Sequence, residues 1–220
     1  VIGAGLAGAL VALLFARRGF TVTVYERRPD PRLDPSDAGR SINLALATRG
    51  LRALERAGLA EQVQPLLTPM RGRMVHGRDG TTSLLPYGQT AREVIYSVER
   101  DQLNTLLIDA ADSHPNVNFR FRHACLGARP AEGALLIRDQ QAEHGYEVAL
   151  TATIATDGAG SAVRTSLAAA GYLNAREELL DHDYKELTIP AVDGAHAIER
   201  HALHVWPRGD YMLIALPNPS

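Results

Sequence analysis

This sequence of 220 residues has a single cysteine, little net charge and no long apolar run, and each of these features excludes a class of protein. Cys125 is the only cysteine, so an internal disulfide framework is excluded, and we expect a packed thiol in the reducing environment of the cytoplasm. The formal net charge is only -2, with basic residues scattered along the chain, which gives no footprint for nucleic acid or for an anionic membrane surface. No stretch reaches the roughly 20 apolar residues that a membrane span needs. We therefore expect small molecules as partners.

The sequence does have the composition of a soluble globular protein, with 45% hydrophobic and 22% charged residues. It begins at Val1 and runs at once into a glycine-rich loop, which indicates a shortened first strand. At the other end, residues 211–216 read as a strand that no closing element follows. We therefore expect this chain to be the front part of a longer protein.

A glycine motif opens the chain, with the sequence Gly3-Ala-Gly5-Leu6-Ala7-Gly8. Residues 6–18 read as a helix closed by Gly19, and residues 20–25 alternate as a strand. Glu26 ends that strand, where a dinucleotide-binding fold carries the acid that binds ribose hydroxyls. The alternative is a plain glycine turn with a surface glutamate. The order of these elements favours a Rossmann-type dinucleotide site, but the motif alone does not separate FAD from NAD.

The rest of the chain continues the alternation of helices and strands and then changes character. We predict helices over residues 48–57, 100–113 and 161–170, strands over residues 94–98, 117–121 and 152–156, and a polar loop over residues 34–42. Residues 134–137 and 147–151 are expected to form an antiparallel arm. After Gly171, strands are predicted at residues 184–189, 203–206 and 211–216, which indicates a sheet-rich second region.

Two further segments carry candidate binding residues. Residues 70–76 and 81–85 flank the turn sequence Gly77-Arg-Asp-Gly80, which indicates a hairpin. Asp157-Gly158 ends a predicted strand directly before a helix, at the edge of the sheet where α/β proteins bind ligands. The alternatives are that Asp157-Gly158 is only a turn and that Ser161 is only a helix N-cap.

Several segments together resemble the kynurenine 3-monooxygenase family of FAD-dependent aromatic hydroxylases, and Asp157-Gly158 resembles their Asp-Gly motif. The segments are Gly39-Arg-Ser-Ile-Asn-Leu-Ala-Leu46, Met70-Arg-Gly-Arg-Met-Val-His76, Leu85-Pro-Tyr-Gly88, Tyr184-Lys-Glu-Leu187, Leu203-His-Val-Trp-Pro207 and Asp210-Tyr-Met-Leu-Ile-Ala-Leu-Pro-Asn218. The resemblance implies an α/β fold, in which a Rossmann-type FAD-binding domain carries a sheet-rich substrate region that is incomplete in this chain. It implies FAD-binding parts in residues 1–70 and 91–175, a substrate-region hairpin in residues 71–90, and the start of a substrate domain in residues 176–220.

The resemblance also implies which residues bind FAD. Glu26 and Arg27 would contact the adenosine end, Ala45 would line the flavin site, and Arg100 would reach the cofactor from its helix start. The Asp157-Gly158 turn and the glycine motif would complete the site, and the motif residues are Gly3, Gly5, Leu6, Ala7 and Gly8. Arg100 could instead cap or pair locally. No flavin contact is assigned around residues 122–125.

Arg73 and Tyr87 are the residues that the resemblance assigns to the substrate carboxylate. An arginine fork can grip a carboxylate through two hydrogen bonds, and a tyrosine hydroxyl supplies a further donor. Without the resemblance, Arg73 reads as a solvated strand charge and Tyr87 as a packed turn aromatic. His196, His201 and His204 lack the carboxylate or thiolate framework of a metal site, so no metal is expected.

For the complete protein the resemblance implies a reaction. NADPH reduces FAD, the reduced flavin captures molecular oxygen as a C4a-hydroperoxide, and this species hydroxylates L-kynurenine to 3-hydroxykynurenine in tryptophan degradation. No catalytic side chain is required, no residues are assigned to NADPH, and this chain by itself is expected to be inactive. The alternatives are an FAD hydroxylase of another aromatic acid and a non-catalytic nucleotide-binding module.

Overall fold

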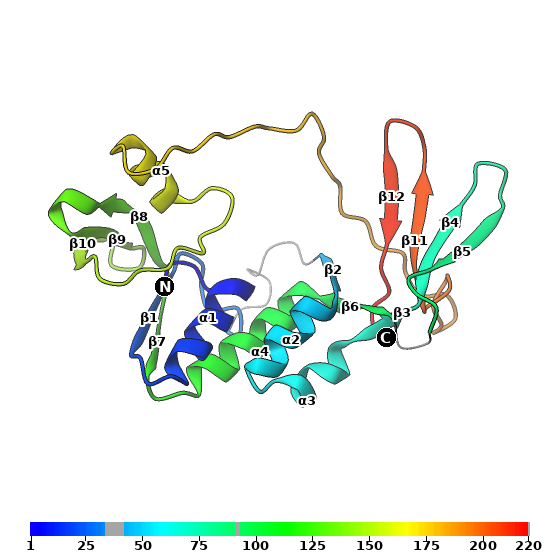
Figure 1. Cartoon of the computed structure of the whole chain (residues 1–220), viewed down its shortest axis with the longest axis horizontal. Coiled ribbons are helices and arrows are strands. Elements are labelled where there is room, and N and C mark those ends of the chain that lie inside the picture. Colours follow the sequence, from blue (N-terminus) through cyan, green and yellow to red (C-terminus); the bar gives the residue numbers. More distant parts are fainter. Residues whose placement is uncertain (34–41, 91–92, 220) are drawn as a thin grey trace. The chain divides into compact units, whose positions relative to one another are not determined.

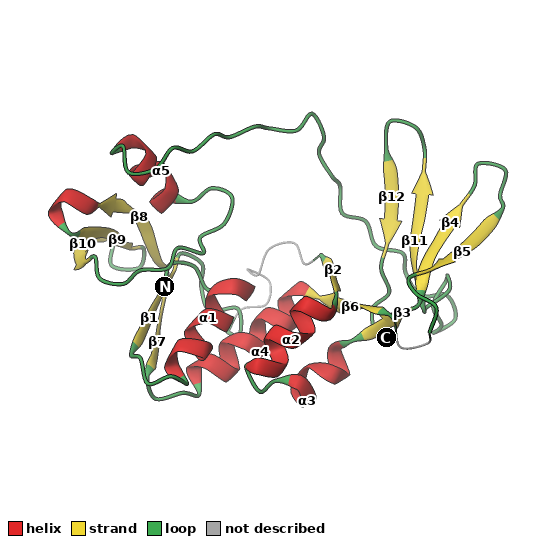
Figure 2. Ribbon diagram, in the orientation of Figure 1, coloured by secondary structure: helices red, strands yellow, loops and turns green. Residues whose placement is uncertain are grey.

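The computed structural model describes residues 1–33, 42–90 and 93–219. Internal contacts divide the chain into two compact units, residues 1–39 with 104–184 and residues 40–103 with 185–220, and the division falls inside helix α4 (Arg100–Asp112). The predicted domain boundaries lie at other residues and stay a prediction, since the units are only groupings of contacts. Figure 1 labels the elements along the chain, and Figure 2 colours them by type. The loop was predicted at residues 34–42, and all of it except residue 42 lies outside the described residues.

The first unit contains the predicted parallel arrangement. Strand β1 pairs in parallel with β7, and Ile2 forms parallel bridges to both Tyr25 of β1 and Ala155. Helix α1 connects the segment around Ile2 to β1, so the order across the sheet is β7, β1, Ile2 and Ala155. These elements are α1 (Leu6–Ala16), β1 (Val22–Glu26) and β7 (Val117–Phe121). The prediction of a Rossmann-type α/β fold is confirmed.

Apolar packing between α1 and the sheet explains why these residues fold this way. The helix turns its small buried side chains toward the strands, and Ala12 of α1 forms a buried cluster with Ala4 of the preceding loop and with Val22 and Val24 of β1. Val117, Phe119 and Phe121 of β7 pack against this cluster. Small residues on the inner face of the helix let its backbone lie close to the sheet, which places the start of α1 at the sheet's carboxyl edge.

The prediction of a complete strand over residues 152–156 is wrong. Only Ala155 forms a bridge, although the backbone hydrogen bonds Ile2 N–H to Ile154 O (2.9 Å) and Thr156 N–H to Ile2 O (2.8 Å) keep the segment alongside the start of the chain. The neighbouring segment turns away at Gly3, whose φ is +95°. The ladder therefore ends after one residue, because an extended segment needs an extended neighbour to pair with.

An antiparallel sheet completes the first unit. The predicted arm is confirmed as the pair β9 and β10, and β8, which the sequence did not predict, lies on the other side of β9. A bulge between Cys125 and Gly127 interrupts β8. Helix α5 contributes Val163 to the buried cluster that this sheet forms with Ile2. The elements are β8 (His123–Arg129), η3 (Pro130–Glu132), β9 (Ala134–Asp139), β10 (His144–Ala149) and α5 (Ala162–Ala169).

The second unit holds two sheets, one of three strands and one of four. The first has the order β2-β6-β3, and Pro69 lies on its edge strand β3, where its missing N–H breaks no ladder. The elements are β2 (Asn43–Leu46), α2 (Thr48–Arg56), α3 (Ala60–Val63), η2 (Gln64–Leu66), β3 (Thr68–Met70) and β6 (Ile95–Glu99). The predicted helices at residues 48–57 and 100–113 are confirmed as α2 and α4.

The four-stranded sheet has the order β12-β11-β4-β5 and contains the predicted hairpin. Its strands are β4 (Gly72–His76), β5 (Thr82–Pro86), β11 (Ala202–Pro207) and β12 (Met212–Ala215). The first strand of the hairpin was predicted to start at Met70, and this start is wrong, because Met70 belongs to β3 and Arg71 separates the two sheets. The strand predicted at residues 184–189 was also wrong, since this segment is exposed and pairs with no described strand.

Two histidines and a tryptophan stack within the four-stranded sheet. His76 Nε2 lies 2.8 Å from His204 Nδ1, and the ring of His76 stacks on Trp206 with centroids 4.1 Å apart. His204 is 2% exposed, and its other ring nitrogen lies 2.7 Å from the carbonyl oxygen of Glu199. Burial lowers the pKa of His76, and the nearby His204 and Arg208 lower it further. Protonation of this ring is therefore unfavourable in the folded chain.

We expect the folded chain to lose stability as the pH falls below about 6.5, the ordinary pKa of histidine. In the unfolded chain His76 takes up a proton near that pH, whereas the lowered pKa makes the same protonation less favourable in the folded chain. Urea unfolding at about pH 8 and about pH 5.5 measures the loss. His76→Phe keeps a stacked ring and should reduce it, while His182→Phe at an exposed position should not. An unchanged loss in His76→Phe would show that another group titrates.

Candidate functional site

The glycine loop between Ile2 and α1 contains glycines with two different physical roles. A Cβ at Gly8 would lie 1.9 Å from the carbonyl oxygen of Gly3, and one at Gly3 would lie 2.7 Å from that of Thr156, so the fold itself requires these two glycines. A Cβ at Gly5 would meet no atom within 4 Å. Packing inside the chain therefore leaves Gly5 unexplained. In dinucleotide-binding loops the second glycine lets the backbone approach a pyrophosphate, and the contact of Gly5 with FAD stays a prediction.

The start of α1 is open to an anion. Gly5 is its N-cap and offers no side chain, so the N–H groups of Leu6, Ala7 and Gly8 have no acceptor among the described residues. Such free N–H groups and the positive end of the helix dipole favour a phosphate. The start of α5 differs, because Ser161 Oγ accepts the Arg164 N–H at 3.0 Å there.

Glu26 lies at the end of β1 beside the glycine loop, as predicted. Its carboxylate accepts the N–H of Ala4 at 2.7 Å and the N–H of Arg28 at 2.9 Å, while Gly3 donates to the carbonyl oxygen of Tyr25 at 2.8 Å. Each carboxylate oxygen keeps a lone pair for a ribose hydroxyl. The neighbouring Arg27 is exposed. The predicted placement is confirmed, and the contacts of both residues with FAD stay a prediction.

Asp157-Gly158 touches the glycine loop from the next segment of the sheet. A Cβ at Gly3 would lie 3.1 Å from the Cα of Asp157. The Asp157 carboxylate accepts the Ser161 hydroxyl at 2.7 Å and the Val163 N–H at 3.4 Å, so it also orders the start of α5. Ser161 is the N-cap of α5, as the structural alternative expects, and the turn lies beside the glycine loop. Its contact with FAD remains a prediction.

Ala45 and Arg100 belong to the second unit, where Ala45 lies on β2 and Arg100 begins α4 directly after the neighbouring strand β6. Ala45 is exposed on β2 and pairs with Ser97 of β6, and Arg100 follows β6 directly. The N–H of Arg100 donates to the carbonyl oxygen of Ile42 at 3.2 Å, which joins the start of α4 to β2. The structure thus brings these two predicted contacts together within their unit. Their placement toward the glycine loop stays a prediction.

Arg73 and Tyr87 lie against each other. The Cζ of Arg73 is 5.6 Å from the centre of the Tyr87 ring, and the guanidinium has no ion pair within residues 1–33, 42–90 and 93–219. The Tyr87 hydroxyl is buried and has no hydrogen-bond partner among the same residues. A buried hydroxyl without a partner is costly. A guanidinium and an unpartnered hydroxyl donor are both groups that bind a carboxylate.

Sequence reasoning missed one polar residue of the second unit, Asn43. Its side chain donates to Ser97 and to the segment that follows β12. The signal was present, because Asn43 lies inside the segment that carries the family resemblance, but nothing in the sequence indicated its partners. Cys125 behaves as predicted, since burial raises the pKa of its thiol and Sγ faces the carbonyl oxygen of Gly127.

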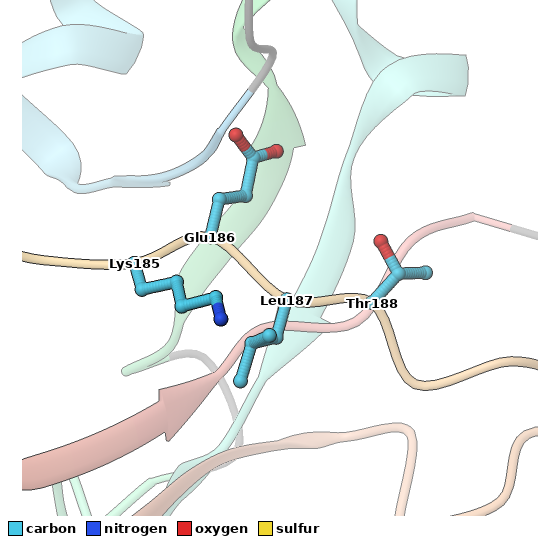
Figure 3. A pocket seen from close by; sticks show the side chains of 4 residues that line it. All are labelled: Lys185, Glu186, Leu187 and Thr188. Atoms are coloured by element: carbon cyan, nitrogen blue, oxygen red, sulfur yellow. The ribbon is translucent and has the colours of Figure 1, made fainter.

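Other features of the described chain offer no second site. No group of three or more histidine, cysteine or acidic side chains there is placed to hold a metal ion, and no helix there is long and apolar enough to cross a membrane. Figure 3 shows a hollow along an extended segment, where Lys185 and Leu187 point to one side and Glu186 to the other. All of its lining residues are exposed, so it would not enclose a cofactor.

The family profile described as FAD binding domain matches residues 1–211, and the chain belongs to this family. Proteins named kynurenine 3-monooxygenase are similar over nearly the whole chain. The one from Stenotrophomonas maltophilia is 46% identical over 220 residues, which are 99% of this chain and 48% of that protein. The one from Myxococcus xanthus is 43% identical over 219 residues, 99% of this chain and 47% of that protein. The chain thus spans about half the length of the curated relatives it matches.

Two solved structures share the fold of this chain. The flavin-dependent monooxygenase PieE, in complex with FAD and substrate, aligns with a TM-score of 0.66 at 22% identity over 76% of this chain and 31% of its own. PqsL of P. aeruginosa, in complex with 2-aminobenzoylacetate, aligns with a TM-score of 0.60 at 22% identity over 81% of this chain and 47% of its own. At these identities the likeness supports the fold alone.

Proposed function

We propose that the full-length protein to which this chain belongs is an FAD- and NADPH-dependent monooxygenase that converts L-kynurenine to 3-hydroxykynurenine. The observation that carries the substrate assignment is Arg73, unpaired in the described chain, lying against Tyr87, whose buried hydroxyl has no partner there. The FAD-binding family and the relatives named kynurenine 3-monooxygenase support the reaction class. We place the reaction in the cytoplasm, because a single free cysteine fits a reducing compartment.

The residues of the first unit fit FAD. The pyrophosphate would approach Gly5 and accept from the N–H groups at the start of α1, while Glu26 would accept from the ribose hydroxyls. Asp157-Gly158 lies within reach of the same loop. FAD supplies the electron transfer and oxygen activation that no side chain provides, so the protein's own part is binding, orientation and exclusion of water.

The Arg73 and Tyr87 pair would hold the amino-acid end of kynurenine. The guanidinium presents two parallel N–H donors to the carboxylate, and the Tyr87 hydroxyl turns its hydrogen to the same group. Binding would thereby satisfy the hydroxyl that is unpartnered in the free chain. Anchoring one end of the substrate restricts where its ring can lie, and such orientation is a large part of the rate gain in enzymes.

The overall reaction balances as one insertion of oxygen. One atom of molecular oxygen replaces hydrogen on the ring carbon beside the amino-bearing carbon, and the other atom leaves as water. NADPH supplies the two electrons and a proton joins from solvent. Exclusion of bulk water by the closed site would favour transfer to the ring over release of peroxide.

Two measurements on the full-length protein test this proposal. Mass spectrometry of the released cofactor should identify FAD, and kynurenine should accelerate NADPH oxidation severalfold. A non-catalytic nucleotide-binding module would show no acceleration with any aromatic acid. An FAD hydroxylase of another aromatic acid, the second enzyme alternative, would respond to that acid and not to kynurenine.

A further inference from the structure

Asn43 of β2 joins three segments of the second unit through one side chain. Its Nδ2 lies 2.5 Å from Asn218 Oδ1, 3.0 Å from Ser97 Oγ and 3.1 Å from the carbonyl oxygen of Pro217. Ser97 lies on β6 and is fully buried, while Pro217 and Asn218 follow β12. An amide nitrogen carries two hydrogens, so the side chain can donate to β6 and to the segment after β12 at the same time.

The two sheets that Asn43 connects carry different predicted contacts. The three-stranded sheet carries Ala45, and Arg100 follows its strand β6, both assigned to FAD. The four-stranded sheet carries Arg73 on β4 and leads into Tyr87 after β5, both assigned to the substrate carboxylate. The distance between the flavin and the substrate ring therefore depends on how these two sheets are fixed to each other.

One joint between the sheets is covalent. Arg71 is the single residue between β3 and β4, and its N–H donates to the carbonyl oxygen of His201 at 2.8 Å while its own carbonyl oxygen accepts the Tyr87 N–H at 3.1 Å. His201 Nδ1 also lies 3.3 Å from the carbonyl oxygen of Pro69, so these links cluster at the β3 end of the three-stranded sheet, where they leave the β2 end free to turn, as hinge residues do. Asn43 supplies a connection at the other end of the three-stranded sheet, between β2 and the segment after β12, and connections at both ends restrict that rotation.

We propose that Asn43 is a positioning residue that fixes the substrate-binding sheet against the flavin-contacting strands and so couples NADPH oxidation to ring hydroxylation. This inference builds on the proposed function. Asn43 acts through Asn218 and Ser97, and neither kynurenine nor FAD needs to touch it. Its loss would let the substrate ring drift from the reacting position, and a misplacement of about 1 Å can cost on the order of a hundredfold in rate.

The test compares variants of the full-length, FAD-loaded protein by the amount of hydroxylated product formed per NADPH oxidised. Asn43→Ala should lower this ratio severalfold, while FAD content and kynurenine affinity stay within about twofold of the parent. The ratio is unaffected by how much protein folds, so a merely structural role would leave it unchanged. Asn118→Ala, at an exposed position on β7, is the matched control and should keep the parental ratio.

Asn218→Ala keeps the inference testable if Asn43→Ala fails to hold FAD. It removes the 2.5 Å contact from the other side, at a half-buried residue, and should lower the ratio in the same direction. The double variant should fall no further than the more affected single one, because both remove the same contact. Parental ratios in FAD-loaded Asn218→Ala, or in both single variants, would overturn the inference while the proposed function stands. A parent protein that hydroxylates no aromatic acid would instead overturn the proposed function.

Discussion

Arg73→Ala in the full-length protein should weaken kynurenine binding while FAD content stays near that of the parent. Removing one partner of a desolvated, charge-assisted pair costs about 2–5 kcal/mol, which corresponds to roughly a thirtyfold to several-thousandfold loss of affinity. FAD content should be unaffected because Arg73 lies on β4 of the four-stranded sheet, and none of the residues assigned to FAD lies on that sheet. Arg73→Lys should restore only part of the affinity, since a point charge cannot reproduce the planar fork. Titration of each variant with kynurenine measures the effect.

Tyr87→Phe should have a smaller effect on binding and an opposite effect on stability. Loss of a neutral hydroxyl donor should weaken kynurenine binding by about 0.5–1.5 kcal/mol. The same change removes a buried hydroxyl that has no partner in the described chain, so the ligand-free protein should be as stable as the parent or more stable, by up to about 1–3 kcal/mol. Denaturant unfolding and ligand titration of the same variant measure the two effects separately.

The decarboxylated analogue of kynurenine is the control for both variants. The parent should prefer kynurenine strongly over this analogue, and Arg73→Ala should lose most of that preference. If Arg73→Ala discriminates between the two ligands as strongly as the parent does, Arg73 does not bind the carboxylate. The substrate assignment would then lose its main support.

Gly5→Ala and Gly8→Ala should impair different properties of the protein, the first its FAD affinity and the second its stability. At Gly5 the added Cβ meets no atom of the chain and the backbone has φ −69°, so the FAD-free protein should fold normally. FAD affinity should nevertheless fall roughly tenfold to a hundredfold, or about 1.4–2.7 kcal/mol, because the Cβ occupies the approach to the pyrophosphate. At Gly8 the Cβ would lie 1.9 Å from the carbonyl oxygen of Gly3, and this overlap should destabilise the fold by about 1–3 kcal/mol or more.

Unfolding of the FAD-free proteins and FAD titration distinguish these outcomes. Normal FAD affinity in Gly5→Ala would contradict the placement of the pyrophosphate at this loop. Normal stability in Gly8→Ala would show that α1 can move away from Gly3 without cost, against the close packing of helix and sheet.

The local features of the cofactor loop could be predicted from the sequence because they depend on short-range chemistry. Glycines before a helix and an acid at the end of the next strand have few other uses in that order, and Glu26 indeed accepts the N–H of Ala4 beside the loop. The hairpin of β4 and β5 was predictable from its glycine-flanked turn. The packing role of Gly8 also follows from the motif, because the third glycine of a Rossmann loop lets the helix lie close to the strand, and a Cβ at Gly8 would indeed overlap Gly3.

Features that depend on distant partners were missed. Strand β8 was missed because the bulge between Cys125 and Gly127 interrupts the alternation of residues by which a strand is recognised. Strand β3 was missed because it contains Pro69, and a proline is tolerated only on the edge strand of a sheet, which the sequence alone does not identify. The alternating segment at residues 184–189 was predicted as a strand, but no described strand pairs with it. Asn43 contacts Asn218, which lies 175 residues further along the chain, and only the folded structure brings the two together.

The most direct test of the central proposal is the mass of the product formed by the full-length protein from kynurenine, NADPH and heavy-isotope oxygen gas. We expect 3-hydroxykynurenine that carries one heavy oxygen atom, formed in proportion to the NADPH oxidised. NADPH oxidation that yields only peroxide, or a product whose added oxygen comes from water, would contradict it.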